Sequence, residues 1–143
     1  MAGLVLAAIL FVNSAFAHKS ETVNEKVQAA FKQEFVQAKE VNWNRTDNYL
    51  KAVFKLNDAV LSAYYTEDGE LIGVMKNLLS TELPINLQTS LKKEYNDYWI
   101  TDLFEFAKQD ATGYFITVEN ADQVITLQST DGFTWSTFRK AKK

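Results

Sequence analysis

The side chains that most often carry enzymatic chemistry are scarce in this chain. Among 143 residues there is one histidine, His18, and there is no cysteine. Without cysteine the chain has no thiol nucleophile, thiolate metal site or disulfide. His18 would become the first residue if the apolar leader before it is removed, and a mobile terminus holds catalytic geometry poorly. We therefore predict no catalytic role for His18, although with a freed α-amino group it could chelate Cu(II) weakly.

The carboxylates, 18 in number, do not form a recognisable site in the sequence. The acidic run Glu67–Glu70 hints at calcium, but calcium loops space their oxygen ligands regularly, and the related segment Thr130–Gly132 carries a single carboxylate. Both segments fit hairpin turns better. The glycine-rich nucleotide motifs and the nucleophile elbow are also absent. We predict a chain that is not an enzyme and holds no cofactor and no metal.

The aromatic residues are a richer set. Three Trp, six Tyr and ten Phe are more than two short helices can cover, so some are expected on a binding surface. The candidate partner-binding face consists of Tyr49, Lys51, Lys55 and Trp135. The first three share one side of an alternating strand. For Trp135 the core and the open face are equal alternatives, whereas Trp43 is expected in the core.

Composition restricts the class of protein further. The chain has 15 basic and 18 acidic residues, a net charge of −3, and no long basic run, so nucleic acid is not an expected partner. A hydrophobic fraction of 47% is too high for disorder. The length suits one compact domain or one doubled repeat.

Residues 1–17 have the composition of a signal peptide. The apolar run Leu4–Val12 carries no charge, and Ala15 and Ala17 fit the small-residue rule for cleavage before His18. The run spans roughly 14 Å as a helix, far less than the hydrocarbon core of a bilayer. We therefore predict a periplasmic or secreted protein with no membrane span after cleavage. The leader lacks the Lys or Arg that usually precedes such a run, which a start further upstream would explain. A buried first helix or strand of a cytosolic protein is the alternative.

The first half of the mature chain reads as one helix and four strands. Thr22–Glu25 forms a predicted capping box, and apolar residues follow at helical spacing up to Phe35. On the strand Tyr49–Leu56, residues Leu50, Ala52, Phe54 and Leu56 should face the helix. The four expected strands are Val41–Asn44, Tyr49–Leu56, Val60–Thr66 and Glu70–Met75.

The second half repeats this order. Ser80 or Thr81 is the expected cap of the second helix, and Pro84 suits its first turn. The expected strands that follow are Ile100–Ala107, Tyr114–Glu119, Val124–Thr130 and Phe133–Arg139.

The two halves align in sequence. Phe31–Phe35 matches Leu91–Tyr95, and Asp68-Gly69 matches Asp131-Gly132. Duplication of one unit explains the shared order, with chance similarity as the alternative. We predict an α+β domain of two tandem repeats, residues 18–79 and 80–143, each of one helix and about four antiparallel strands. The helices would cover one face of a sheet of about eight strands, leaving the other face open.

Several segments resemble the beta-lactamase-inhibitor-like, PepSY-like family of exported bacterial proteins. They are Val27–Phe35, Ala38–Trp43, Tyr49–Asn57 and Ser62–Gly69, with Leu83-Pro84 opening the second helix. The resemblance implies a tandem helix-plus-four-strand fold, export and no known enzymatic activity. The namesake inhibitor grips an enzyme with its open sheet face, but it is disulfide-bonded and this chain has no cysteine. Inhibitor activity is therefore not transferred.

These patterns predict an exported, non-enzymatic binding module that contacts a protein or peptide through the open face of its sheet. The alternative is a periplasmic protein that binds a small ligand or metal in a pocket between sheet and helices. An enzyme that uses carboxylates alone is a third reading, which no pair of acids supports. Edge strands could pair between chains, so the oligomeric state stays open.

Overall fold

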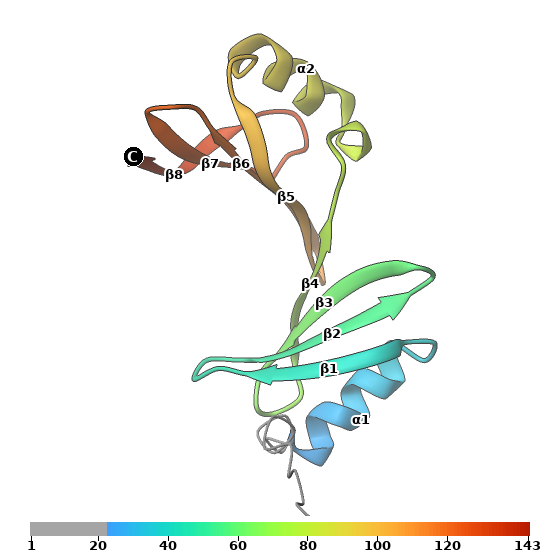
Figure 1. Ribbon diagram of the computed structural model, residues 1–143. Helices are drawn as coiled ribbons and strands as arrows, with labels where there is room; N and C mark the ends of the chain where they lie inside the picture. Colours follow the sequence, from blue (N-terminus) through green and yellow to red (C-terminus); the bar gives the residue numbers. More distant parts are fainter. Residues whose placement is uncertain (1–22) are drawn as a thin grey trace, which may run out of the picture.

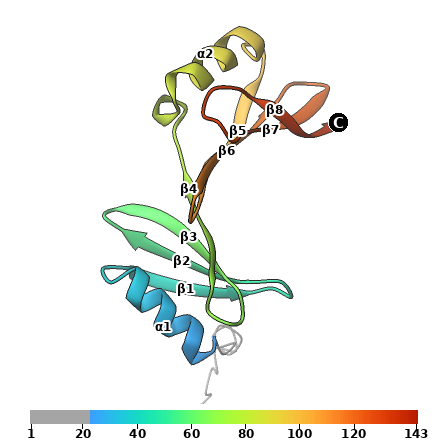
Figure 2. The ribbon, with the colours of Figure 1, turned by 180° about the vertical axis from the view of Figure 1, so that it is seen from behind.

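The computed structural model describes residues 23–143, which form one sheet and its covering helices (Figures 1 and 2). The helical elements are α1 (Glu25–Glu34), the short 3₁₀ helix η2 (Ser80–Glu82) and α2 (Ile85–Glu94). The strands are β1 (Lys39–Arg45), β2 (Leu50–Leu56), β3 (Ala59–Tyr65), β4 (Leu71–Asn77), β5 (Trp99–Lys108), β6 (Ala111–Glu119), β7 (Gln123–Ser129) and β8 (Ser136–Lys142). Within residues 23–143, no helix is long and apolar enough to cross a membrane.

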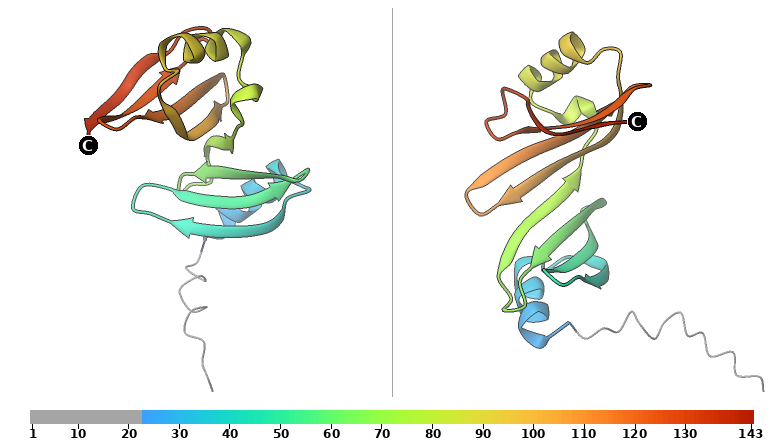
Figure 3. Two further views of the ribbon diagram at one scale, coloured as in Figure 1. Left: turned by 45° about the horizontal axis from the view of Figure 1, so that its top comes forward. Right: turned by 90° about the vertical axis from the view of Figure 1, so that its left-hand side faces the viewer.

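The eight strands lie in the sheet in the same order as in the chain, and every neighbouring pair is antiparallel. This confirms the predicted α+β class and the eight-stranded sheet. A helix followed by four strands occurs twice in the chain; that the halves derive from one duplicated unit stays a prediction. Figure 1 shows α1 against β1–β3 at one end and α2 beside β5–β8 at the other. The right-hand view of Figure 3 shows β4 running from one half to the other.

Both helices pack on the same face of the sheet. Leu61, which packs against the core under α1, pairs with Lys76 on β4. Lys76 pairs with Glu105 on β5, and Glu105 pairs with Tyr114, which packs against the core under α2. Directly paired residues in adjacent strands point to the same side. The register therefore places both cores on one face, as predicted.

Each half has its own apolar core. Leu50, Ala52 and Phe54 on β2 are buried, and Leu56 packs beside them, as the alternating pattern predicts. Trp43 also packs against this core, in an edge-on contact with Phe31 (ring centroids 5.3 Å apart). The buried residues of the second core are Leu83, Leu87, Leu91, Leu103, Ile116, Val118, Ile125 and Leu127.

The start of α1 differs from the predicted capping box. Asn24 is the cap, and its Oδ1 accepts the backbone N–H of Val27 at 3.0 Å. The predicted capping box, which named Thr22 as the cap, is therefore wrong about the capping residue. Thr22 itself lies outside the described residues. Asn24 has extended backbone angles, which bring its short amide side chain over the first turn. The predicted signal peptide and His18 also lie outside the described residues.

The start of α2 differs in a similar way. Ser80 and Thr81, the predicted caps, belong to η2, and the α-helix begins at Ile85 after the cap residue Pro84. Proline disfavours helical angles in the residue before it, so the α-helix can only start after Leu83. The missing N–H of Pro84 is harmless at this position.

Tight turns join the strands. Asn57 and Asp58 both have positive φ, +49° and +64°, as a two-residue hairpin turn between β2 and β3 requires. At Gly69 (φ +86°) a Cβ would also lie 3.1 Å from the carbonyl oxygen of Lys26 on α1. Glycine therefore lets the β3–β4 turn approach the first turn of the helix closely.

Candidate functional site

The face of the sheet opposite the helices, called here the open face, carries two groups of aromatic rings. In the first, the ring centroid of Tyr64 lies 5.2 Å from that of Tyr49 and 6.0 Å from that of Phe106. In the second, Phe115 stacks on Phe104 at 5.2 Å and meets Phe138 edge-on at 5.6 Å. These distances are those of favourable ring pairs. The rings come from β3, β5, β6 and β8 and from the residue preceding β2.

The rings of the first aromatic group lie on both sides of β4 and come together over its glycine, Gly73. A Cβ at Gly73 would lie 2.7 Å from Cε1 of Phe106, so the Phe106 ring covers the space above this residue. Met75, two residues further on β4, pairs with Phe106 and has its sulfur 3.9 Å from the Tyr64 hydroxyl. Gly73 and Met75 therefore connect the rings of β3 and β5 into one apolar surface.

Lysines border these rings. The Nζ of Lys51 lies 5.6 Å from the centre of the Tyr64 ring, and the Nζ of Lys108 lies 5.9 Å from the centre of the Phe106 ring. Both distances allow a cation–π interaction. Arg139 pairs with Thr126, whose hydroxyl bonds to Thr117 on the same side. None of the ion pairs found within residues 23–143 involves these three cations.

The structure places three of the four predicted site residues on the open face. Tyr49 and Lys51 both contact Tyr64 there, and Lys55 forms an ion pair with Glu40 at 2.8 Å. Contact of these residues with a partner remains a prediction.

Trp135 lies on the opposite side, so the alternative that placed it on the open face is wrong. Its indole Nε1 donates to the carbonyl oxygen of Leu87 on α2 at 3.1 Å, and the ring packs against the second core. The sequence pattern assumed a strand from Phe133, but β8 begins at Ser136. Asp131 holds the residues just before β8 in a turn, because its carboxylate accepts hydrogen bonds from the N–H groups of Phe133 and Thr134. The chain therefore reaches Trp135 before it joins the sheet.

Sequence reasoning missed the rings of Phe104, Phe106 and Phe115 as parts of this face. The sequence predicts a regular strand over Ile100–Ala107, and regular alternation would place Ile100, Phe104 and Phe106 on one side of it. A bulge between Ile100 and Asp102 shifts the phase, so Leu103 points into the second core and Phe104 points to the open face. A bulge leaves little trace in composition, and Thr101 is an ordinary strand residue.

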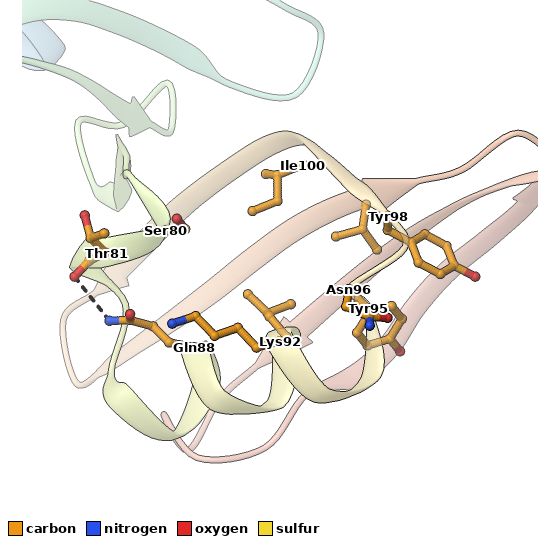
Figure 4. A pocket seen from close by; sticks show the side chains of 10 residues that line it. Ser80, Thr81, Gln88, Lys92, Tyr95, Asn96, Tyr98 and Ile100 are labelled. Atoms are coloured by element: carbon orange, nitrogen blue, oxygen red, sulfur yellow. Dashed lines mark hydrogen bonds between the residues drawn. The ribbon is translucent and has the colours of Figure 1, made fainter.

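A second feature is a hollow beside α2, with a volume of about 380 Å³ (Figure 4). Its lining includes the apolar side chains of Leu91, Ile100 and Val118, and Figure 4 shows Lys92 on α2 bordering it. Gln88 closes one end by donating from Nε2 to the carbonyl oxygen of Thr81 at 3.2 Å. The volume is within the range of small-ligand sites.

Among the tyrosines with raised pKa values, Tyr65 lies in the first core and Tyr95 lines the hollow. Burial raises the pKa of Tyr65 to about 12, and the Glu34 carboxylate acts in the same direction. Burial also raises the pKa of Tyr95 in the hollow, with Glu94 and Tyr98 contributing. Both hydroxyls therefore stay protonated at neutral pH. Over the described part of the chain, no group of three or more His, Asp or Glu side chains could hold a metal ion.

Fold and site together define a class: an eight-stranded antiparallel meander with helices on one face and an aromatic, lysine-bordered open face. No protein-family model matches the chain, and no curated protein matches its sequence. Solved structures do match. A BLIP-like protein from Bacteroides fragilis has 16% sequence identity and a TM-score of 0.70, covering 83% of this chain and 85% of that one.

Two further solved structures are similar. A DUF2874 family protein from Bacteroides uniformis has 16% identity and a TM-score of 0.73, and a chain from Bacteroides eggerthii described as one of the "putative periplasmic proteins" has 18% identity and a TM-score of 0.72. Each of these two matches covers 83% of this chain and 88% of the other chain. The resemblance to a beta-lactamase-inhibitor-like group is thus confirmed at the level of fold. The description of the Bacteroides eggerthii chain agrees with the predicted periplasmic or secreted location.

Proposed function

We propose that the chain is an exported, non-enzymatic binding module that contacts a protein or peptide through the open face of its sheet. The observation that carries the proposal is the combination of the two aromatic groups with cations that have no ion-pair partner among the described residues. Tyr64, Phe104, Phe106 and Phe115 are half-buried, and neither α1 nor α2 covers them. Large rigid rings of this kind are enriched at protein interfaces.

The neighbours in structure support the same proposal. One of them is described as BLIP-like and another as periplasmic, and this chain shares their fold. Residues 1–17 fit a signal peptide, and residues 18–79 and 80–143 fit two copies of one PepSY-like unit. The recurrence of a helix and four strands in the same order supports the duplication.

Site-directed photo-crosslinking in the native cell envelope tests the binding face. A photoreactive phenylalanine analogue replaces Tyr49 on the open face, and in a matched variant it replaces Ala29, which is exposed on α1. We expect discrete crosslinked protein bands from position 49 that are absent from position 29. Equal crosslinking at both positions, or none at position 49 with the folded protein present, would contradict the proposal.

A second candidate function is binding of a small ligand in the hollow beside α2, favoured by its volume of about 380 Å³ and its apolar lining. The variant Ile100→Trp would place a larger side chain at the border of the hollow. If the hollow binds a ligand, compounds that raise the melting temperature of the unaltered protein should lose that effect in the variant. Compounds that stabilise both proteins equally would place binding elsewhere.

A further inference from the structure

The open face has a charge opposite to that of the whole chain. The chain carries a net charge of −3, yet Lys51, Lys108 and Arg139 lie on this face without any of the ion pairs found among residues 23–143. Among its acids, Glu40 pairs with Lys55 and Glu119 pairs with Lys143. Asp102, which lies on this face through its pairing with Thr117, accepts a hydrogen bond from Asn77 Nδ2 at 3.4 Å and forms none of these ion pairs. The cations are therefore available to anions from outside the chain.

Lys51 and Lys108 lie at opposite ends of one row of residues that crosses the sheet. Lys51 on β2 pairs with Tyr64 on β3, and Tyr64 pairs with Gly73 on β4. The Phe106 ring covers Gly73, and the Nζ of Lys108 lies 5.9 Å from that ring. The row thus runs from a cation across two aromatic rings to a second cation.

The dimensions of this row set a requirement for the occupant. The row crosses from β2 to β5, which is three strand spacings or roughly 14 Å. In an extended segment, side chains four residues apart lie about 13 Å from each other. Two carboxylates at that spacing, with apolar side chains between them, would meet both lysines and the rings.

We propose that the partner recognised by the open face is an acidic protein segment that presents two carboxylates about 14 Å apart with apolar side chains between them. This inference rests on the proposed function and specifies its partner class. A second copy of the chain is disfavoured because two open faces would bring like charges together. An anionic membrane is disfavoured because the central rings are half-buried and packed against one another, whereas membrane insertion uses protruding apolar side chains.

The test is selection of peptides from a random dodecapeptide library displayed on phage, with the folded protein as bait. We expect enriched peptides with net negative charge and acidic residues about four positions apart. A synthetic peptide of the enriched sequence is then titrated calorimetrically against the protein and its variants. The double variant Lys51→Glu with Lys108→Glu should bind about tenfold more weakly or worse, and raising the salt concentration should weaken binding to the unaltered protein.

A matched variant controls for net charge. Lys32→Glu with Lys93→Glu makes the same charge change at exposed positions on α1 and α2 that lie outside the hollow, and it should alter the affinity by less than about twofold. Equal loss in both double variants would overturn the inference. So would enrichment of neutral or basic peptides, or failure to enrich any peptide relative to the Lys51→Glu, Lys108→Glu bait.

Other outcomes separate this inference from the function on which it rests. If neutral peptides are enriched and their binding is lost in Tyr64→Ala, the open face binds peptides but the acidic requirement is wrong. Sedimentation with vesicles of phosphatidylglycerol and phosphatidylcholine, lost in Lys51→Glu with Lys108→Glu and without any peptide binding, would assign the face to a membrane and overturn both. A dimer that the same variant dissociates would assign the face to a second copy.

Discussion

At the scale of single residues, position 73 shows how the open face is built. A Cβ there would lie 2.7 Å from Cε1 of the Phe106 ring, closer still to its Cζ, and 3.0 Å from the carbonyl oxygen of Ala107. We expect Gly73→Ala to displace that ring and to lower the free energy of unfolding by about 1–3 kcal/mol. Urea unfolding followed by circular dichroism measures this loss.

A double-mutant cycle checks the cause. In a Phe106→Ala background the ring is gone, so Gly73→Ala should cost clearly less than it does in the unaltered protein. An equal cost in both backgrounds would mean that the strain comes from the backbone at Ala107 and not from the ring.

The carboxylate of Asp131 stabilises the turn before β8 through hydrogen bonds. It accepts hydrogen bonds from the Thr134 hydroxyl at 2.7 Å and from two backbone N–H groups. These bonds hold the pKa of Asp131 well below its usual range, and the bonds from Thr134 have the largest effect. Because the folded-state pKa is depressed, the stabilisation is present above the unfolded-state pKa of about 3.9 and is lost as pH falls through the folded-state value.

We therefore expect Asp131→Asn to be less stable than the unaltered protein at pH 7. Between pH 5 and pH 2.5, the variant should lose less stability than the unaltered protein loses. Melting temperatures measured across this range give the comparison. Asp122→Asn is a matched control in the neighbouring β6–β7 turn, where Asp122 donates its backbone N–H to Asn120 Oδ1 at 2.9 Å. If both variants show the same pH dependence, the Asp131 bonds are not its source.

At the scale of elements, Asn24 fixes the start of α1 in two ways. Its Oδ1 caps the helix through Val27 N–H, and its Nδ2 donates to the carbonyl oxygen of Glu67 in the β3–β4 turn at 2.8 Å. Asn24→Ala should reduce the free energy of unfolding by about 0.5–2 kcal/mol. Asn24→Asp keeps the cap but loses the Nδ2 donor, so an intermediate loss in urea unfolding is expected. An Asp variant as unstable as the Ala variant would assign the effect to the turn contact alone.

Trp135 links α2 to the segment before β8. Replacing it with phenylalanine removes the bond from Nε1 to the Leu87 carbonyl and part of the ring contact with the second core. We expect Trp135→Phe to cost about 1–2 kcal/mol of unfolding free energy and to leave binding at the open face unchanged. Thermal unfolding and the peptide titration measure the two effects. A variant of normal stability that loses binding would return Trp135 to the binding surface.

The sequence predicts regular elements well and irregular ones poorly. The alternation on β2 predicted both its buried residues and the open-face positions of Tyr49 and Lys51, because nothing interrupts its period. On β5, a bulge after Ile100 reversed the side on which the following residues lie, and the turn at Asp131 delayed β8 until Ser136. The bulge depends on backbone pairing between strands, which residue types along one strand do not specify. The late start of β8 follows from the hydrogen bonds that Asp131 accepts from Phe133 and Thr134, which compete locally with strand pairing.

At the scale of the whole molecule, one sheet joins two separate cores. The cluster around Leu50 and the cluster around Leu87 share no buried residue. The halves meet where β4 pairs with β5, and this pairing is short, running from Val74 with Ala107 to Asn77 with Phe104. Local opening follows local packing density, so each half can lose structure with limited effect on the other.

Hydrogen exchange measured by mass spectrometry tests this independence. Leu50 and Leu87 are both fully buried, one in each core, and truncation to alanine should cost about 2–5 kcal/mol at either site. We expect Leu50→Ala to speed exchange in β2 and β3 more than in β6 and β7, and Leu87→Ala to do the reverse. Uniform acceleration in both halves by either variant would show one cooperative unit, in which the β4–β5 pairing transmits the loss completely. The open face extends over both halves, so independent opening of one half would also weaken binding to a partner that contacts the two aromatic groups together.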